Sequence, residues 1–170
     1  MTILELCITS ALLLLVLMSV LSALDSVSGA QAYQADRTQN LDNMRGVLNT
    51  MTKELRQATA VSDTSTASSL TFSTSINGVS TQIVYTVTGT GTTRILTKQM
   101  GSAAAYTALA HLDPDQTTAV FTYVIADNVT GIQWVKIDLE VSPARHPETT
   151  LVLESEINLR NRTTALTGSA

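Results

Sequence analysis

The sequence contains few cysteines, few aromatic residues and no cluster of basic residues. Its one cysteine, Cys7, excludes an internal disulfide and a site with several thiolate ligands. Lys and Arg nowhere gather as they do on surfaces that follow a phosphate backbone, and the net charge is -4, so we expect no nucleic-acid partner. Charged residues make up 14% and aromatic residues 4% of the 170 residues, whereas Ser and Thr are abundant. This composition suits a single globular head rich in β-structure.

Motifs for catalysis or metal binding are also scarce. The two histidines, His111 and His146, have no second His or Cys at metal-ligand spacing, and we interpret both as surface residues. Asp113-Pro114-Asp115 and Asp127-Asn128 could supply oxygens to Ca²⁺, but neither belongs to a loop with a closing Glu, so we favour turns. No nucleophile motif occurs. We therefore predict no enzymatic activity, no cofactor and no metal site.

Two tripeptides, beginning at Asn128 and Asn161, fit the acceptor pattern for N-glycosylation. The pattern is short and frequent by chance, so we favour unmodified side chains at both positions. Glycosylation at these two asparagines stays open as the alternative.

A long uncharged segment lies near the N-terminus. Residues 6–24 contain no charge, Pro or Gly, and as a helix with a rise of ~1.5 Å per residue they would span roughly 28 Å. This length is close to the hydrocarbon thickness of a bilayer. A cleavable signal peptide is the alternative, but it requires a basic region before the apolar core, and the first basic residue is Arg37. We therefore expect a membrane-spanning helix.

A carboxylate, Glu5, stands at the edge of this apolar segment, where an ionisable side chain calls for a partner. The positive group closest in sequence is the α-amino group of Met1, either of the same chain or of a neighbouring copy. A position of Glu5 in the lipid headgroup region is the alternative. The segment 1–24 resembles the mature N-terminus of type IV pilins and type II secretion pseudopilins, which begin with an apolar residue, Thr, two aliphatic residues and Glu, followed by an unbroken apolar helix.

The resemblance implies a fold and a set of partners. A prepilin peptidase would remove a short leader and methylate Met1, and Glu5 would pair with the N-terminal amine of a neighbouring subunit, with Met1, Thr2 and Glu5 as the assembly residues. The partners would be further copies of the chain, the prepilin peptidase, and the assembly platform with its ATPase. The chain would reside in a prokaryotic cytoplasmic membrane and then in an extracellular pilus. The residues expected in the filament core are Leu6, Leu12, Leu13, Leu14, Leu15, Val16, Leu17, Val20, Leu21 and Leu24.

The role within the family is open among three alternatives. We favour the major pilin. A minor pilin or a secretion pseudopilin is the second alternative, because the sequence lacks the helix-breaking Gly and Pro and the C-terminal disulfide loop of many major pilins. The third, from another class, is an extracytoplasmic binding module anchored by a single span.

Residues 25–61 are predicted to continue the helix as an amphipathic segment that ends near Val61. Apolar residues recur every three or four positions, which indicates one face packed on a partner. The charged positions between them are typical of a solvated face. The apolar stripe consists of Leu41, Met44, Leu48, Met51, Leu55 and Ala58, and the charged positions are Asp36, Arg37, Asp42, Arg45, Lys53, Glu54 and Arg56.

Residues 62–170 are predicted to form the β-rich head. After a Ser/Thr-rich loop at 62–69, the period changes to two in Leu70–Ile76 and Val79–Thr88, and Asn77-Gly78 between them indicates a hairpin. A turn at 89–91 leads to a third strand at Arg94–Lys98.

The second half of the head is predicted to hold three more strands, at Ala119–Ala126, Ile132–Val141 and Leu151–Leu159, with turns at Asp127-Asn128 and Ser142–Pro147. Residues 102–112 are predicted to be a short helix or a loop, and Trp134 is predicted to pack in the core. The expected fold is α+β, a type IV pilin-like long helix packed on an antiparallel sheet of about four to seven strands.

Overall fold

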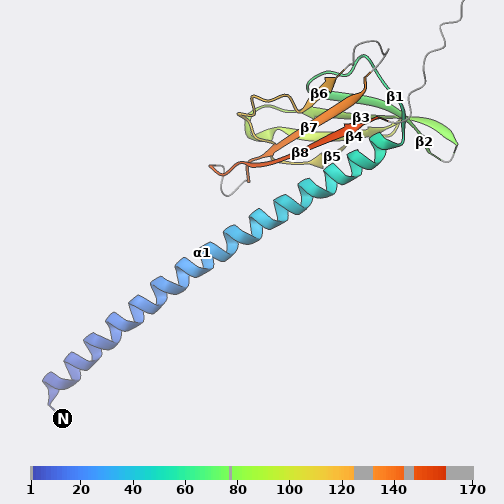
Figure 1. The fold of residues 1–170 in the computed structure, drawn as a ribbon. Coiled ribbons are helices and arrows are strands. Elements are labelled where there is room, and N and C mark those ends of the chain that lie inside the picture. Colours follow the sequence, from blue (N-terminus) through green and yellow to red (C-terminus); the bar gives the residue numbers. More distant parts are fainter. Residues whose placement is uncertain (1, 77, 125–131, 144–147, 160–170) are drawn as a thin grey trace, which may run out of the picture. The chain divides into compact units, whose positions relative to one another are not determined.

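The computed structural model describes residues 2–76, 78–124, 132–143 and 148–159. Within these residues, helix α1 is followed by eight strands, which Figure 1 labels, and by one 3-10 turn, η1. The chain divides between Gln39 and Asn40 into two units, and α1 contributes to both. The bounds are α1 Ile3–Arg56, β1 Ala58–Val61, β2 Ser69–Ile76, β3 Val79–Thr88, η1 Gly91–Thr93, β4 Ile95–Met100, β5 Tyr106–Leu109, β6 Phe121–Val124, β7 Trp134–Val141 and β8 Leu151–Asn158.

The carboxyl-terminal part of α1 packs on the head through the predicted apolar stripe. Met44, Leu48, Met51 and Leu55 are buried, and Leu41 is half-buried against the same core. Their spacing of three and four places them on one side of the helix. The layout is therefore α+β, a long N-terminal helix packed on an antiparallel sheet as in the type IV pilin fold.

The predicted end of the helix near Val61 is wrong. Helix α1 ends at Arg56, and Ala58–Val61 forms β1, which pairs antiparallel with β2. Ala58 is buried, as expected, but it is buried as a strand residue. Thr59 and Val61 are β-branched and favour a strand, and the edge of β2 offers backbone hydrogen bonds that a further helical turn would not use.

The first sheet has five antiparallel strands in the order β1-β2-β3-β4-β5. The predicted hairpin is confirmed, since Ile76 pairs with Val79 across two residues and Gly78 has a φ of +80°. Asn77 lies outside the described residues. Strand β4 forms the third strand, at Ile95–Met100 in place of Arg94–Lys98, as a partner of β3. The loop expected at 62–69 gives way to β2 at Ser69.

Residues 102–112 contain strand β5, so the expectation of a helix or a loop is wrong there. Tyr106–Leu109 pairs with β4, with Leu109 opposite Leu96. Leu109 and Leu96 are both buried. The alanines before Tyr106 show no alternation of polar and apolar residues, so the sequence pattern does not indicate a strand. The strand forms because the edge of β4 offers backbone hydrogen bonds to it.

The second sheet has three antiparallel strands in the order β6-β7-β8, so the expectation of one sheet is corrected to two. The three strands themselves are confirmed, with ends that differ by a few residues. The turn expected at Asp127-Asn128 lies outside the described residues, as do residues 144–147 of the other turn. One hydrophobic core contains side chains of α1 and of both sheets.

Trp134 does not pack in that core, contrary to expectation. Along β7, Val135 and Ile137 are buried while Trp134 is half-buried, in step with the alternation of a strand. Since the aliphatic positions 135, 137, 139 and 141 occupy the core face, Trp134 falls on the opposite face of the sheet.

Glu54 joins α1 to the first sheet, so the prediction that it belongs to a solvated face is wrong. Its Oε2 accepts a hydrogen bond of 2.7 Å from the Tyr85 hydroxyl, and its Oε1 forms an ion pair with the Lys98 ammonium. The Lys98 side chain is only 6% exposed and lies over the Tyr85 ring. Burial, followed by the adjoining Glu54 carboxylate, raises the pKa of Tyr85 well above its ordinary value. These contacts fix the orientation of the helix on the sheet.

Asp113 connects the two sheets at one end of the head. Its carboxylate accepts hydrogen bonds from the hydroxyls of Thr150 and Ser142, at 2.7 and 2.9 Å, and from the N–H of Asp115 at 2.8 Å. The Arg94 guanidinium donates to the main-chain oxygen of Asp113 at 3.0 Å. Burial acts to raise the pKa of Asp113, but the hydrogen bonds and Arg94 outweigh it and hold that pKa below its ordinary value of 3.8.

Candidate functional site in the apolar part of helix α1

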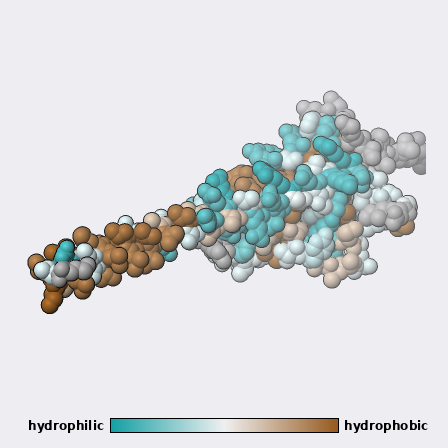
Figure 2. All heavy atoms as spheres, turned by 90° about the horizontal axis from the view of Figure 1, so that it is seen from below, coloured by the Kyte–Doolittle hydropathy of each residue, from teal (hydrophilic) through white to brown (hydrophobic). Residues whose placement is uncertain are grey.

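The apolar part of α1 is exposed around its whole circumference. Each of the ten residues expected in the filament core has between 51% and 68% of its surface exposed, including the consecutive residues 12–17. Figure 2 shows hydrophobic surface along this part of the helix. No side of the helix is buried in the way the stripe at 44–55 is buried. An exposed apolar surface of this extent marks a region that contacts lipid or another protein surface.

Two hydroxyl groups in this segment, those of Thr9 and Ser10, are satisfied within the helix. Thr9 donates to the main-chain oxygens of Glu5 and Leu6 at 3.0 Å, and Ser10 donates to that of Cys7 at 3.0 Å. These two side chains therefore do not need water as a hydrogen-bond acceptor, which lowers the cost of placing the helix in hydrocarbon.

Thr2 and Glu5 cap the helix reciprocally. The Glu5 carboxylate accepts from the N–H of Thr2 and the Thr2 hydroxyl accepts from the N–H of Glu5, both at 3.4 Å. This is a capping box, in which each side chain binds a backbone N–H of the first turn; the N–H of Glu5 is shared with the main-chain oxygen of Thr2, at 3.0 Å. The structure thus brings together two of the three expected assembly residues. Met1, the third, lies outside the described residues.

The capping box is a role of Glu5 that the sequence reasoning missed. The signal was available, because Thr2-Ile3-Leu4-Glu5 has the required spacing of three. Both capping distances are long, and the carboxylate is exposed and charged next to the positive end of the helix dipole. Glu5 can therefore cap its own helix and still offer an oxygen to an approaching cation.

The other candidate residues are not brought together into a site. His111 is exposed at a positive φ of 58°, and the Asp113 carboxylate is already occupied by three donors. Among the residues that the structure describes, no group of His, Cys, Asp and Glu is arranged to hold a metal ion. His146, Asp127, Asn128 and Asn161 lie outside those residues.

A shallow cavity of about 200 Å³ lies between α1 and β5, lined by Gly46, Thr50, Lys98 and Tyr106 among others. Its one charged group is the Lys98 ammonium, which is already paired with Glu54. The Tyr85 hydroxyl at its wall is bound to the same Glu54 carboxylate.

The fold and the exposed segment define a chain whose N-terminal helix is long and apolar enough to anchor in a membrane. Comparisons with protein-family models, with curated proteins and with solved structures give no match.

Proposed function

We propose that this protein is a structural subunit of a type IV pilus-like filament, with the major pilin as the favoured role. The observation that carries the proposal is an apolar helical segment with no buried face, continuous with a helix that packs firmly on a β-rich head. The resemblance of residues 1–24 to pilin N-termini supports the same conclusion. Before assembly, the segment would span a prokaryotic cytoplasmic membrane, and in the filament the same surface would lie against neighbouring helices.

The exchange of lipid for neighbouring helices is central to this function. Burying an apolar side chain from water yields about 1.5–3 kcal/mol. Moving the same side chain from lipid to a helix bundle is far closer to neutral, because lipid tails are equally apolar. Polar contacts therefore decide the register between subunits, and the work of extraction falls to the assembly platform and its ATPase.

Glu5 is the residue proposed to set that register. An exposed carboxylate at the end of an apolar helix lowers its free energy by meeting a cation when lipid is replaced by neighbouring chains. The proposed cation is the N-terminal amine of an adjacent subunit, methylated by a prepilin peptidase as the resemblance implies. The long capping distances leave the Glu5 oxygens able to accept it.

The capping box favours a second candidate function, an extracytoplasmic binding module held by a single span. Under this alternative Thr2 and Glu5 serve only to start the helix, and the chain needs no copy of itself. A minor pilin or secretion pseudopilin stands between the two. The amount of this chain in purified filaments, measured by mass spectrometry, distinguishes a major from a minor subunit.

Two substitutions separate the capping role of Glu5 from its charge. Glu5→Gln keeps the capping box, because Gln caps as Glu does, but it removes the negative charge. Thr2→Ala removes a cap, at a cost of about 0.5–2 kcal/mol, and retains the charge. We expect Glu5→Gln to remain in the membrane while filament yield collapses, and Thr2→Ala to lower the yield much less.

The measurement is filament yield by electron microscopy, with the membrane content of the chain determined by immunoblot as the control. Normal filaments from Glu5→Gln would refute the pairing role of the charge. If the wild-type chain stays in the membrane and forms no filaments even when the assembly machinery is co-expressed, the anchored module is favoured instead.

A further inference from the structure

The face of the second sheet that points away from the core carries a cluster of acidic groups. In β7, residues 135, 137, 139 and 141 face the core, so the alternate residues lie on the other side. The strand register places Glu154 opposite Asp138 and Glu156 opposite Lys136. We call this surface the acidic face. Its charged members are Lys136, Asp138, Glu140, Glu154 and Glu156.

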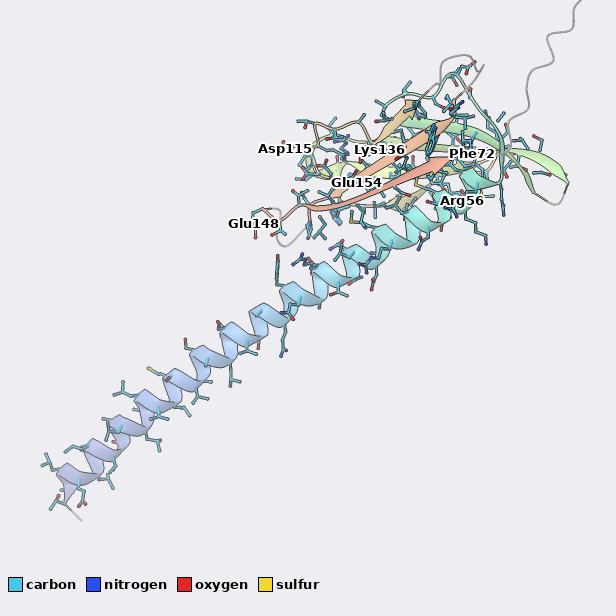
Figure 3. The ribbon with its side chains drawn as sticks, viewed as in Figure 1. Arg56, Phe72, Asp115, Lys136, Glu148 and Glu154 are labelled. Atoms are coloured by element: carbon cyan, nitrogen blue, oxygen red, sulfur yellow. The ribbon has the colours of Figure 1, made fainter. Side chains whose placement is uncertain are left out.

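The single cation on the acidic face is already shared. The Lys136 ammonium lies 3.2 Å from Oδ1 of Asp138 and 2.9 Å from Oε2 of Glu154. Figure 3 labels Lys136 on β7 and Glu154 on β8. The hydrogen bond to Glu154, followed by that to Asp138, raises the pKa of Lys136.

The acidic face keeps an excess of negative charge. Glu140 and Glu156 form no ion pair within the described part of the chain, and Oδ2 of Asp138, a residue only 4% exposed, has no hydrogen-bond donor there. One ammonium therefore stands among four carboxylates.

Among the described residues, the exposed cations of the head lie on a different element. Arg45, Lys53 and Arg56 are all exposed on the last part of α1, and Arg45 and Arg56 lie nearly in line because eleven residues make about three helical turns. We call these three residues the basic strip. Lys53 and Arg56 form no ion pair with any described residue, and Arg45 has only a 3.6 Å contact to the exposed Asp42.

The remaining described cations of the head are not available to a partner. Arg94 binds the main-chain oxygen of Asp113, and Lys98 is buried with Glu54. No described ion pair joins the basic strip to the acidic face within one chain. The two surfaces are thus complementary in charge and unmatched inside the subunit.

We propose that the basic strip of one copy docks on the acidic face of the next copy in the filament. This inference rests on the proposed function, because assembly is what brings the heads into contact. An interface between two different surfaces of the same chain can repeat from copy to copy and generates a helical filament where the rotation does not close into a ring, whereas a self-complementary patch would stop at a dimer. The apolar helices hold the copies together, and the charged surfaces set the rotation between heads.

Exposed ion pairs are individually weak and are screened by salt. The same ion pairs occur at every interface between subunits, so the effect of reversing one charge is repeated along the whole filament. Wild-type filaments should therefore lose length or straightness at high ionic strength before they dissociate into subunits.

The test uses charge reversal with rescue in the full chain. One variant carries Glu154→Lys and Glu156→Lys, a second carries Lys53→Glu and Arg56→Glu, and a third combines all four substitutions. All four side chains are exposed, so the head should fold in each variant. Asp63→Lys, at an exposed position in the loop after β1, is the control for a change of net charge.

We expect each charge-reversed pair to lower filament yield at least fivefold, and the combined variant to recover to within twofold of wild type. The control should stay near wild type. Normal yield in both reversed pairs, or loss in both without recovery in the combination, overturns the docking proposal.

A second measurement does not depend on any variant. In wild-type filaments a carbodiimide should join the Lys53 amine to the carboxylate of Glu154 or Glu156, and mixed isotope labelling should show that the joined peptides come from different copies. Filaments that yield no such intermolecular peptide also overturn the docking. If the wild-type chain forms no filaments, the proposed function fails and the docking fails with it. Failure of rescue or cross-linking in good filaments affects the docking alone.

Discussion

Removal of Glu54 should destabilise the head more than removal of its partner Lys98. Glu54 accepts from the Tyr85 hydroxyl and pairs with Lys98, whose side chain is only 6% exposed, whereas Glu54 is 20% exposed. Glu54→Ala leaves a buried ammonium with no counter-charge and a buried hydroxyl with no acceptor. Lys98→Met removes the ammonium but leaves a carboxylate that still binds Tyr85 and reaches water.

The magnitudes follow from this difference in exposure. Breaking a buried pair by removing one partner costs about 3–5 kcal/mol, and the partial exposure of Glu54 places Glu54→Ala near the lower end of that range. Lys98→Met should lower the free energy of unfolding by about 1 kcal/mol, the net worth of a lost hydrogen bond. Asp42→Ala is the matched control on the same helix, because the Asp42–Arg45 pair is more than 60% exposed on both sides and should contribute less than about 0.5 kcal/mol.

Urea unfolding of residues 25–170, followed by Trp134 fluorescence, measures these differences. The slope of free energy against urea should stay constant, so that midpoints report stability directly. The reasoning is refuted if Lys98→Met costs as much as Glu54→Ala, or if both fall within the range of the Asp42→Ala control.

Three further outcomes are expected. The folded-state pKa of Asp113 lies below its unfolded value, so the stability that the Asp113 carboxylate contributes is complete above the unfolded pKa and disappears as pH falls through the folded pKa. Asp113→Asn should therefore flatten the loss of stability between about pH 5 and pH 2, and an unchanged dependence of stability on pH would contradict this. Gly89→Ala should lower the free energy of unfolding by about 1–3 kcal/mol, because Gly89 has a φ of +85° and a Cβ there would stand 2.3 Å from the Thr93 oxygen. Gly78→Ala, with a similar φ and open space around it, should cost less, and the same urea unfolding measurement compares the two variants. Residues 25–170 without the apolar segment should be soluble and monomeric, and stable oligomers in size-exclusion chromatography would argue against the assembly role of that segment.

Local patterns predicted much of the head correctly. The three-and-four spacing of Met44, Leu48, Met51 and Leu55 predicted the buried side of α1, and Asn77-Gly78 predicted the hairpin between β2 and β3. Both features depend on residues close together in sequence, where helical or strand periodicity and turn geometry are directly visible.

The errors share a different cause. Strand β1 begins where a helix was expected, β5 replaces an expected helix or loop, and Glu54 is half-buried rather than solvated. Each depends on a partner in another segment: β2 for β1, β4 for β5, and Tyr85 with Lys98 for Glu54. A pattern within one segment does not contain the position of its partner, which for Glu54 lies 31 and 44 residues away.

The candidate site divides in the same way. The sequence by itself determined the apolar run, the carboxylate at its end and the Thr2–Glu5 spacing, because these are properties of consecutive residues in one helix. Only the tertiary structure decided that the second sheet shows an acidic face while the free cations remain on α1. Strand register and ion pairing, which join residues distant in sequence, determine which charges are used inside the subunit and which are left for another copy.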